Sequence, residues 1–209
     1  SFYANKNVTT GQGGMITVNN EEDARLLRMM RMYGLQEGAE GRYNEKKINH
    51  YLVQFPGYNF RIFDLLSAIG IHQLKKLDKL NAKRKKVMNM YNEAFSNMDH
   101  IEIFKVKDYT TSHGVHLYSI LVDIDNLKIR RDEFINKLIA RNIGTGLHYD
   151  ALHLHPYYQN KYKFKKGDFP NAEHISDRTI SIPFFPSMTE ENTDYVINSV
   201  KEIIKGSKK

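Results

Sequence analysis

One lysine near the start of the chain has neighbours that suit covalent chemistry. Lys6 follows the aromatic run SFYAN and precedes the glycine-rich segment NVTTGQGG. A lysine amine that has lost its proton can attack an aldehyde, and burial beside aromatic rings or a second nearby cation favours that loss. Glycine lets the backbone approach a ligand closely. By itself the segment leaves two interpretations open: a surface lysine beside a turn, which is the commoner case, or a nucleophile for an aldehyde cofactor such as pyridoxal phosphate.

Five histidines are the side chains best suited to a metal. His148, His153 and His155 lie close together in GLHYDALHLHPYY, and His113 and His116 lie upstream. Imidazole is a common zinc ligand. The five form no i, i+4 pair and no HExxH motif, and the chain has no cysteine. The sequence therefore predicts no metal site.

Charge and composition exclude several classes of protein. The chain has 209 residues, 41% of them hydrophobic, and a net charge of +7. Its lysines gather in KKLDKLNAKRKK, KYKFKK and KEIIKGSKK. Solvated helix faces and a frayed tail are the first explanation of these lysines. An anionic ligand is the second explanation, and a nucleic acid is the last. The longest apolar runs are too short to span a bilayer, and no secretion signal is visible. We expect a cytoplasmic protein that binds neither nucleic acid nor membrane.

Hydrophobic periodicity predicts the elements of the first half. Residues 15–20 are expected to form a short strand, 21–34 a helix that stops at Gly34, and 35–49 a surface excursion. The segment FPGYNFR is a turn-rich connector. From Asp64 to about Met98, apolar residues recur at steps of three or four, which predicts one long helix.

The second half alternates strands and helices. Strands are expected in IEIFKV, HLYSILVDI and IGTGLHY, a helix in RRDEFINKLIARN, and a short helix followed by an apolar run in DFPNAEHISDRTISIPFFP. Thr189 caps a last helix, EENTDYVINSVKEIIKG. This order predicts an α/β chain. The long helix links two lobes, so the domain boundary is expected near residue 98, with one domain over 1–98 and the other over 99–209.

The lysine segment as a whole resembles that of a known enzyme family. SFYANKNVTTGQGG is similar to the Schiff-base lysine segment of the DegT/DnrJ/EryC1/StrS family, which are nucleotide-sugar aminotransferases dependent on pyridoxal 5'-phosphate. The matching residues are Ser1, Phe2, Lys6, Asn7, Thr10, Gly11, Gly13 and Gly14, and Gln12 stands where glutamate is usual. The resemblance continues through PGYNFRIFDLLSAIGIHQLKKLD, NIGTGLHYDALHLHPYY and GDFPNAEHISDRTISIPFFPSMT. It implies the fold-type-I fold, from the end of the large domain through a long linking helix to a small α+β domain.

The resemblance assigns cofactor roles. It implies that Lys6 bonds to pyridoxal 5'-phosphate and later moves the proton as base and acid, that Ser1 contacts the phosphate, and that Asn59 reaches the phosphate of a neighbouring subunit, which makes the active form a homodimer. Arg61 is expected to bind the carboxylate of the amino donor or a phosphate, or else to form an interface salt bridge. Relatives that dehydrate carry a histidine in place of the lysine, so Lys6 favours transamination.

The resemblance also implies which residues line the substrate side of the pocket. His148 and His153 are expected to bind sugar hydroxyls or the diphosphate, with a structural histidine as the alternative for each, and Tyr149 to line the sugar pocket. His155 and His116 are expected to be structural. The implied substrates are a UDP-linked 4-keto sugar and glutamate, for the synthesis of surface polysaccharide, lipopolysaccharide or glycoconjugate.

The match begins at the lysine segment, whereas the family carries much of its cofactor pocket upstream of it. The sequence therefore indicates a C-terminal part of such an enzyme, inactive by itself. Two other classes stay open. One is a truncated, catalytically inactive interaction or dimerisation module, and the more distant one is a basic protein that binds nucleic acid.

Overall fold

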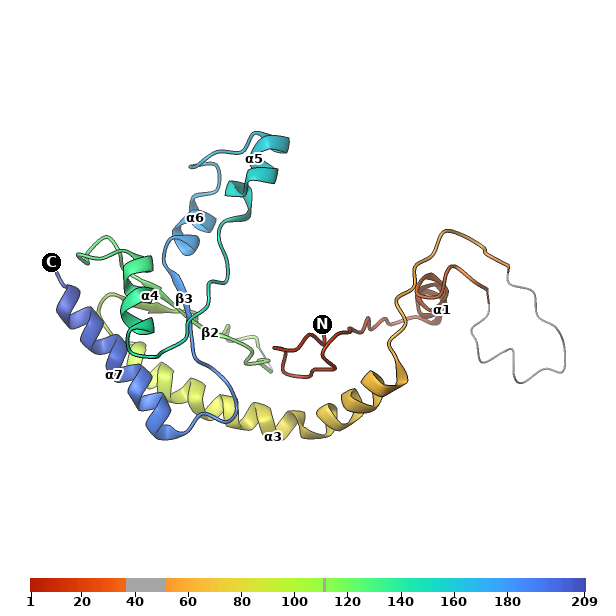
Figure 1. Ribbon diagram of the computed structural model, residues 1–209, viewed down its shortest axis with the longest axis horizontal. Coiled ribbons are helices and arrows are strands. Elements are labelled where there is room, and N and C mark those ends of the chain that lie inside the picture. Colours follow the sequence, from red (N-terminus) through yellow and green to blue (C-terminus); the bar gives the residue numbers. More distant parts are fainter. Residues whose placement is uncertain (37–51, 111) are drawn as a thin grey trace. The chain divides into compact units, whose positions relative to one another are not determined.

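The computed structural model describes residues 1–36, 52–110 and 112–209 (Figure 1). The chain divides into two compact units, Ser1–Leu77 and Asp78–Lys209, which are described separately. The division falls inside a long helix. The domain boundary near residue 98 stays a prediction, and most of the surface excursion predicted for 35–49 lies outside the described residues.

The first helix of the first unit, α1, spans Glu21–Met30 and confirms the predicted helix. Asn20 is its N-cap, and its side-chain oxygen accepts a hydrogen bond from the backbone N–H of Asp23 at 2.7 Å. Three acidic residues in the first turn complement the helix dipole. The helix ends earlier than expected, and Gly34 then turns the chain at a φ of +71°.

The strand predicted over residues 15–20 is absent from the structure. Met15 and Ile16 are exposed, and no described segment pairs with them. Residues with strand propensity form a strand only where a partner supplies the hydrogen bonds, so residue type alone misled the prediction.

Helix α3 spans Asp64–Phe95, so the predicted long helix is confirmed and ends three residues earlier than expected. Its first part belongs to the first unit and exposes Leu65, Ile71 and Leu74. Its last turns belong to the second unit, where they bury Val87, Tyr91 and Phe95 in the main core.

The second unit is built on a three-stranded antiparallel sheet. The strands are β1 (Ile101–Ile103), β2 (Tyr118–Val122) and β3 (Thr179–Ile182), in the order β1-β2-β3. Successive side chains of a strand point to opposite faces of the sheet. One face therefore carries Ile120 and its neighbour Ile180 into the core, and the other carries the paired serines Ser119 and Ser181.

Two helices complete the core of this unit. Helix α4 (Arg131–Ile139) packs against α7 (Glu190–Ser207), and both appear beside the sheet in Figure 1. Thr189 caps α7 as predicted, since its hydroxyl accepts from the backbone N–H of Asn192 at 3.1 Å. None of the described helices combines the length and the apolar character that a bilayer crossing requires.

The segment between β2 and β3 differs from the prediction. Residues 143–149 form no strand and make one antiparallel bridge, between Gly146 and Ser181. A 3-10 turn, η1 (Leu152–Leu154), and helix α5 (Pro156–Tyr162) follow, and neither was predicted. Helix α6 (Pro170–Ser176) is the predicted short helix.

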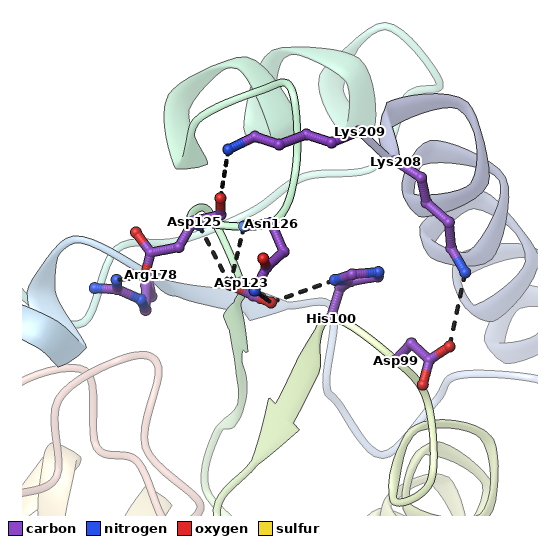
Figure 2. A network of polar contacts seen from close by, with 8 residues as sticks. All are labelled: Asp99, His100, Asp123, Asp125, Asn126, Arg178, Lys208 and Lys209. Atoms are coloured by element: carbon purple, nitrogen blue, oxygen red, sulfur yellow. Dashed lines mark hydrogen bonds and ion pairs between the residues drawn. The ribbon is translucent and has the colours of Figure 1, made fainter.

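A polar network joins the end of β2 to the C-terminus of α7 (Figure 2). Asp123 accepts from the side-chain amide of Asn126 at 2.8 Å and lies 3.3 Å from His100 Nδ1. The Asn126 amide is the main cause that lowers the pKa of the Asp123 carboxyl, against the opposing effect of desolvation. Lys209 Nζ donates to the carbonyl oxygen of Asp125, so the chain end is tied to this turn.

Two buried tyrosines bring polar atoms into the core. Tyr91 donates to the carbonyl oxygen of Pro183 and Tyr118 donates to Asn92 Oδ1, each at 2.8 Å. Their rings lie 4.8 Å apart. Burial raises the pKa of both hydroxyls above the ordinary value, so they stay protonated and act as donors.

The Tyr91 hydrogen bond gives a stability test. Tyr91→Phe removes a buried donor, so the free energy of unfolding is expected to fall by about 1 to 2 kcal/mol in urea denaturation followed by circular dichroism. Tyr109→Phe is the matched control, because Tyr109 is 84% exposed, and its effect is expected to stay within about 0.5 kcal/mol. Equal losses in the two variants would contradict the role of this bond.

Candidate active site

Backbone hydrogen bonds close the segment around Lys6 into a loop. The N–H of Phe2 donates to the carbonyl oxygen of Gly13 at 2.8 Å, and the N–H of Thr10 donates to that of Phe2 at 3.0 Å. Inside the loop, the N–H of Lys6 donates to the carbonyl oxygen of Tyr3 at 3.0 Å. Lys6 therefore lies in a tight turn, half-buried, between two tied ends.

Thr10 and three glycines hold this loop. Thr10 is buried, and its hydroxyl donates to the carbonyl oxygen of Gln12 at 2.6 Å. A Cβ on Gly13 would lie 2.8 Å from Thr10 Oγ1, and one on Gly70 of α3 would lie 3.0 Å from Thr10 Cγ2. Gly13 also has a φ of +144°, and Gly11 one of +80°. Gly13 and Gly70 give Thr10 its space, a role that the sequence analysis did not assign to either.

Ser1 lies at the exposed end of the loop. Its hydroxyl oxygen accepts from the backbone N–H of Tyr3 at 3.3 Å. The hydroxyl hydrogen stays available as a donor, so the phosphate contact predicted for Ser1 remains a prediction that this geometry allows.

Asn59 and Arg61 form one polar group. Arg61 Nε donates to Asn59 Oδ1 at 3.1 Å, and the guanidinium lies 5.4 Å from the ring centroid of Tyr33, with Nη2 3.4 Å from its hydroxyl. Because Nε can only donate, this contact fixes the amide orientation and turns the Asn59 NH2 away from Arg61. Among the ion pairs between described residues, none contains Arg61, so the predicted salt bridge at an interface remains a prediction.

The end of α1 positions this polar group. Asn59 and Met32 form an isolated antiparallel β-bridge, and the N–H of Tyr33 donates to the carbonyl oxygen of Tyr58 at 2.8 Å. Gly34 and Gly57 allow these two backbone segments to lie close together, since a Cβ on Gly34 would lie 1.9 Å from the carbonyl oxygen of Phe55.

The donor types of the first unit fit pyridoxal 5'-phosphate. The cofactor has an aldehyde that needs an amine and a phosphate that needs hydrogen-bond donors. Lys6 offers the amine, Ser1 a hydroxyl, Asn59 an amide NH2 and Arg61 a guanidinium. Among the described residues, no carboxylate contacts Asn59 or Arg61, so this group contains no negative charge that would repel an anion.

The second unit contains the predicted substrate-side residues. His148 Nδ1 lies 2.7 Å from Ser181 Oγ, and its ring meets the Tyr149 ring edge-on at a centroid distance of 4.8 Å. His148 is half-buried, and Tyr149 is 73% exposed. Both are thus accessible to a ligand. The two units are described separately, so these residues are not placed relative to Lys6.

His153 lies in a different environment from His148. It is buried, its Nε2 lies 2.9 Å from Glu173 Oε1, and its ring packs 4.8 Å from that of Phe169. Glu173 also accepts from the backbone N–H of Gly167 at 2.7 Å. These contacts tie η1 to the start of α6 and support the structural alternative, while the substrate role predicted for His153 remains a prediction.

The sequence analysis missed the residues that support this unit. Desolvation of Glu173 raises its pKa, but the hydrogen bonds from Gly167, His153 and Phe169 outweigh it, so the net pKa lies below the ordinary value. Arg131 Nη1 donates to the carbonyl oxygen of Ser176 at 2.5 Å and anchors α6 against α4. Glu173 falls in one of the matched motifs, yet nothing local marks it as the partner of a histidine twenty residues away.

A cavity of about 260 Å³ lies elsewhere in the second unit. It is lined by His100, Ile101, Glu102, Leu121, Val122, Asp123, Asp125, His174 and Arg178, none of which is a predicted site residue. In the described ranges no group of three histidine or carboxylate side chains is arranged to hold a metal ion.

Sequence comparisons identify relatives over nearly the whole chain. A model of the DegT/DnrJ/EryC1/StrS aminotransferase family matches residues 1–201. An uncharacterized protein of Methanocaldococcus jannaschii, MJ1066, is 43% identical over 98% of this chain and 53% of its own length. The spore coat polysaccharide biosynthesis protein SpsC of Bacillus subtilis is 40% identical over 99% of this chain and 53% of its own. The chain spans about half the length of the curated relatives it matches.

Solved structures confirm the expected fold class. Helicobacter pylori PseC, an aminotransferase involved in the biosynthesis of pseudoaminic acid, matches with a TM-score of 0.85 at 25% identity, over 99% of this chain and 52% of its own. The PLP form of a putative sugar aminotransferase from Streptococcus pneumoniae, Spr1654, has a TM-score of 0.81 at 23% identity, over 99% and 51%. The α/β arrangement is therefore that of the sugar aminotransferases.

The Glu173 contacts give a prediction on acid stability. Because folding lowers the pKa of Glu173, the unfolded chain takes up this proton first as the pH falls, and stability is lost below the ordinary glutamate pKa of about 4.3. Glu173→Gln is expected to weaken this acid dependence and to lower stability at neutral pH, as measured by urea unfolding at several pH values.

A matched control is available in β1. Glu102→Gln changes an exposed carboxylate and is expected to keep the acid dependence of the unsubstituted chain. If Glu173→Gln instead retained the full loss of stability in acid, the stabilising role of this carboxylate would be disproved.

Proposed function

The chain belongs to the DegT/DnrJ/EryC1/StrS aminotransferase family, and on this premise we propose that it acts in a pyridoxal-phosphate-dependent transfer of an amino group to a keto sugar carried by a nucleotide. The observation that carries the proposal is the closed loop around Lys6, whose sequence resembles the lysine segment of that family. The loop holds the backbone of the half-buried Lys6 in a tight turn next to a glycine-rich segment.

Lys6 has two tasks in this proposal. It would hold the cofactor through a bond to the aldehyde carbon, formed with loss of water. Once the amino donor has displaced it, the freed amine would carry a proton between the α-carbon of the donor and C4′ of the cofactor. Pyridoxal phosphate supplies the electron sink that makes this carbon acidic. The tight turn at Lys6 suits both tasks because it fixes the backbone from which the amine extends.

Asn59 and Arg61 are proposed to bind anionic groups. Arg61 turns the Asn59 NH2 outward, where it can donate to the cofactor phosphate, and its own guanidinium suits the carboxylate of the donor. In keeping with the family resemblance, we propose that Asn59 serves a neighbouring subunit, so that the active form is a homodimer with shared sites. Ser1 is proposed as a further phosphate donor.

His148 and Tyr149 are proposed to bind the sugar or its diphosphate. His148 uses Nδ1 on Ser181, so Nε2 is the ring nitrogen left for a ligand, and Tyr149 adds an exposed hydroxyl and ring. For His153, the buried pair with Glu173 supports a structural role, in which it holds the segment that follows Tyr149.

The substrates can be proposed more narrowly. We propose a UDP-linked 4-keto sugar as acceptor and glutamate as donor, in the synthesis of surface polysaccharide, lipopolysaccharide or another glycoconjugate. SpsC is a spore coat polysaccharide biosynthesis protein and PseC takes part in pseudoaminic acid biosynthesis, and both support a glycan pathway. Nucleotide sugars and glutamate are cytoplasmic metabolites, so a cytoplasmic location follows from this proposal.

Removal of the amine tests the proposal. Lys6→Ala in the complete protein, loaded with pyridoxal phosphate, is expected to reduce transamination from glutamate to a UDP-4-keto sugar at least about 100-fold, since general acid–base catalysis by one group supplies that much. Lys201→Ala, at an exposed position of α7, is the matched control and is expected to keep full turnover. Undiminished turnover in Lys6→Ala would refute the role of Lys6.

The same assay separates the substrate classes. Faster turnover of a UDP-4-keto sugar than of a 3-keto sugar would support the narrower proposal. The reverse order would leave the aminotransferase activity in place and overturn the choice of substrate.

A further inference from the structure

We propose that Ser181 is a positioning residue that, together with Ser119, fixes the imidazole of His148 with its Nε2–H directed to the ligand. The proposal rests on the proposed function in that His148 is taken to bind the substrate. It names two serines that the sequence analysis did not identify, and it specifies the ring nitrogen and the proton that take part.

Two short contacts join the three side chains. His148 Nδ1 lies 2.7 Å from Ser181 Oγ, and Ser181 Oγ lies 2.7 Å from Ser119 Oγ. Ser181 is only 4% exposed, so water has little access to replace either contact. The three polar groups therefore form a continuous relay that begins in β2, crosses β3 and ends at the imidazole.

The sheet sets the position of the serine pair. Ser119 and Ser181 are direct partners in the register of β2 and β3, so their side chains lie together on the face opposite Ile120 and Ile180. Ser181 also exchanges two backbone hydrogen bonds with Gly146, of 2.9 and 2.8 Å. The Ser181 hydroxyl and the backbone two residues before His148 are thus held in one rigid frame.

Gly146 supplies the space for the ring. A Cβ on Gly146 would lie 2.8 Å from His148 Cε1 and 3.4 Å from its Nδ1. The imidazole therefore packs directly over this glycine, with the Tyr149 ring against it edge-on. A ring held by a hydrogen bond, a backbone surface and an aromatic edge has little freedom to turn.

The relay has one direction in which every donor is satisfied. If Ser119 donates to Ser181 and Ser181 donates to Nδ1, all hydroxyl hydrogens are used, and the neutral ring carries its proton on Nε2. In the reverse direction the Ser119 hydrogen would have no acceptor, because the described residues show no other contact for this hydroxyl. Because Ser119 is half-buried, that hydrogen would need water as its acceptor, so the contacts within the protein favour the first direction.

The resulting tautomer matches the proposed ligand. Within the described part of the chain no protein group bonds to Nε2 of His148, so its N–H can donate. Keto, hydroxyl and phosphate oxygens of a nucleotide sugar are all acceptors. Ser181 and Ser119 would therefore specify recognition of a substrate oxygen without touching the substrate.

The tautomer is tested by nitrogen NMR on the 209-residue chain. Spectra are recorded at alkaline pH, so that the two neutral tautomers are compared. The signals of His148 are identified by their loss in His148→Gln. We expect the unsubstituted chain to show a protonated Nε2 and an unprotonated Nδ1, and Ser181→Ala to show two nitrogens with averaged shifts.

Two variants complete this test. Ser181→Thr keeps the hydroxyl and is expected to restore the Nε2–H tautomer, and Ser199→Ala, at an equally buried serine of α7, is expected to leave the His148 signals unchanged. The proposal is overturned if the unsubstituted chain carries its proton on Nδ1. It is also overturned if Ser181→Ala leaves the His148 signals as they were.

A kinetic measurement separates this proposal from the proposed function. In the protein loaded with pyridoxal phosphate, Ser181→Ala is expected to raise KM for the keto sugar about 10-fold, the effect of losing one hydrogen bond, with the glutamate half-reaction unchanged. If the tautomer changes as expected while KM does not, Ser181 positions the ring as proposed and the substrate role of His148 is the part that fails.

Discussion

The closure of residues 2–13 by backbone hydrogen bonds is the constraint on which the candidate site depends. Phe2 pairs with Gly13 and with Thr10, and these contacts confine the chain between them to a small loop with Lys6 in its turn. Among the described residues no strand pairs with this loop, so its shape depends on a buried threonine, on glycines at positive φ and on the close approach of Gly70 to Thr10. A substitution that adds a Cβ at Gly13 would change the loop that positions Lys6 and would leave the reactive amine itself unaltered.

In the second unit, one face of the sheet packs in the apolar core, and the opposite face supports the segment proposed to bind the substrate. The face of Ile120 and Ile180 joins α3, α4 and α7 in the apolar core. The face of Ser119 and Ser181 supports the segment of His148. Because successive side chains alternate, the same strands that anchor the core also set the position of the serine hydroxyls. The apolar core thereby fixes the positions of the Ser119 and Ser181 hydroxyls, although these serines lie on the opposite face of the sheet.

Much of this organisation could be predicted from sequence, because its signals are local. Lys6 stands within a contiguous motif, and α3 and α7 follow from helical periodicity and a cap. Ser181 and Glu173 could not be predicted as partners, since each lies 20 or more residues from the histidine it contacts and only folding brings them together. The failed strand over 15–20 has the same cause, as strands depend on distant partners.

The most direct test of the account is to locate the covalent bond to the cofactor. The protein is incubated with pyridoxal phosphate, reduced with borohydride and digested, and the modified lysine is identified by mass spectrometry. The account predicts a single pyridoxyl group on Lys6, at much lower yield in Gly13→Ala, whose added Cβ would lie 2.8 Å from Thr10 Oγ1. A label on another lysine, with Lys6 unmodified, would contradict it.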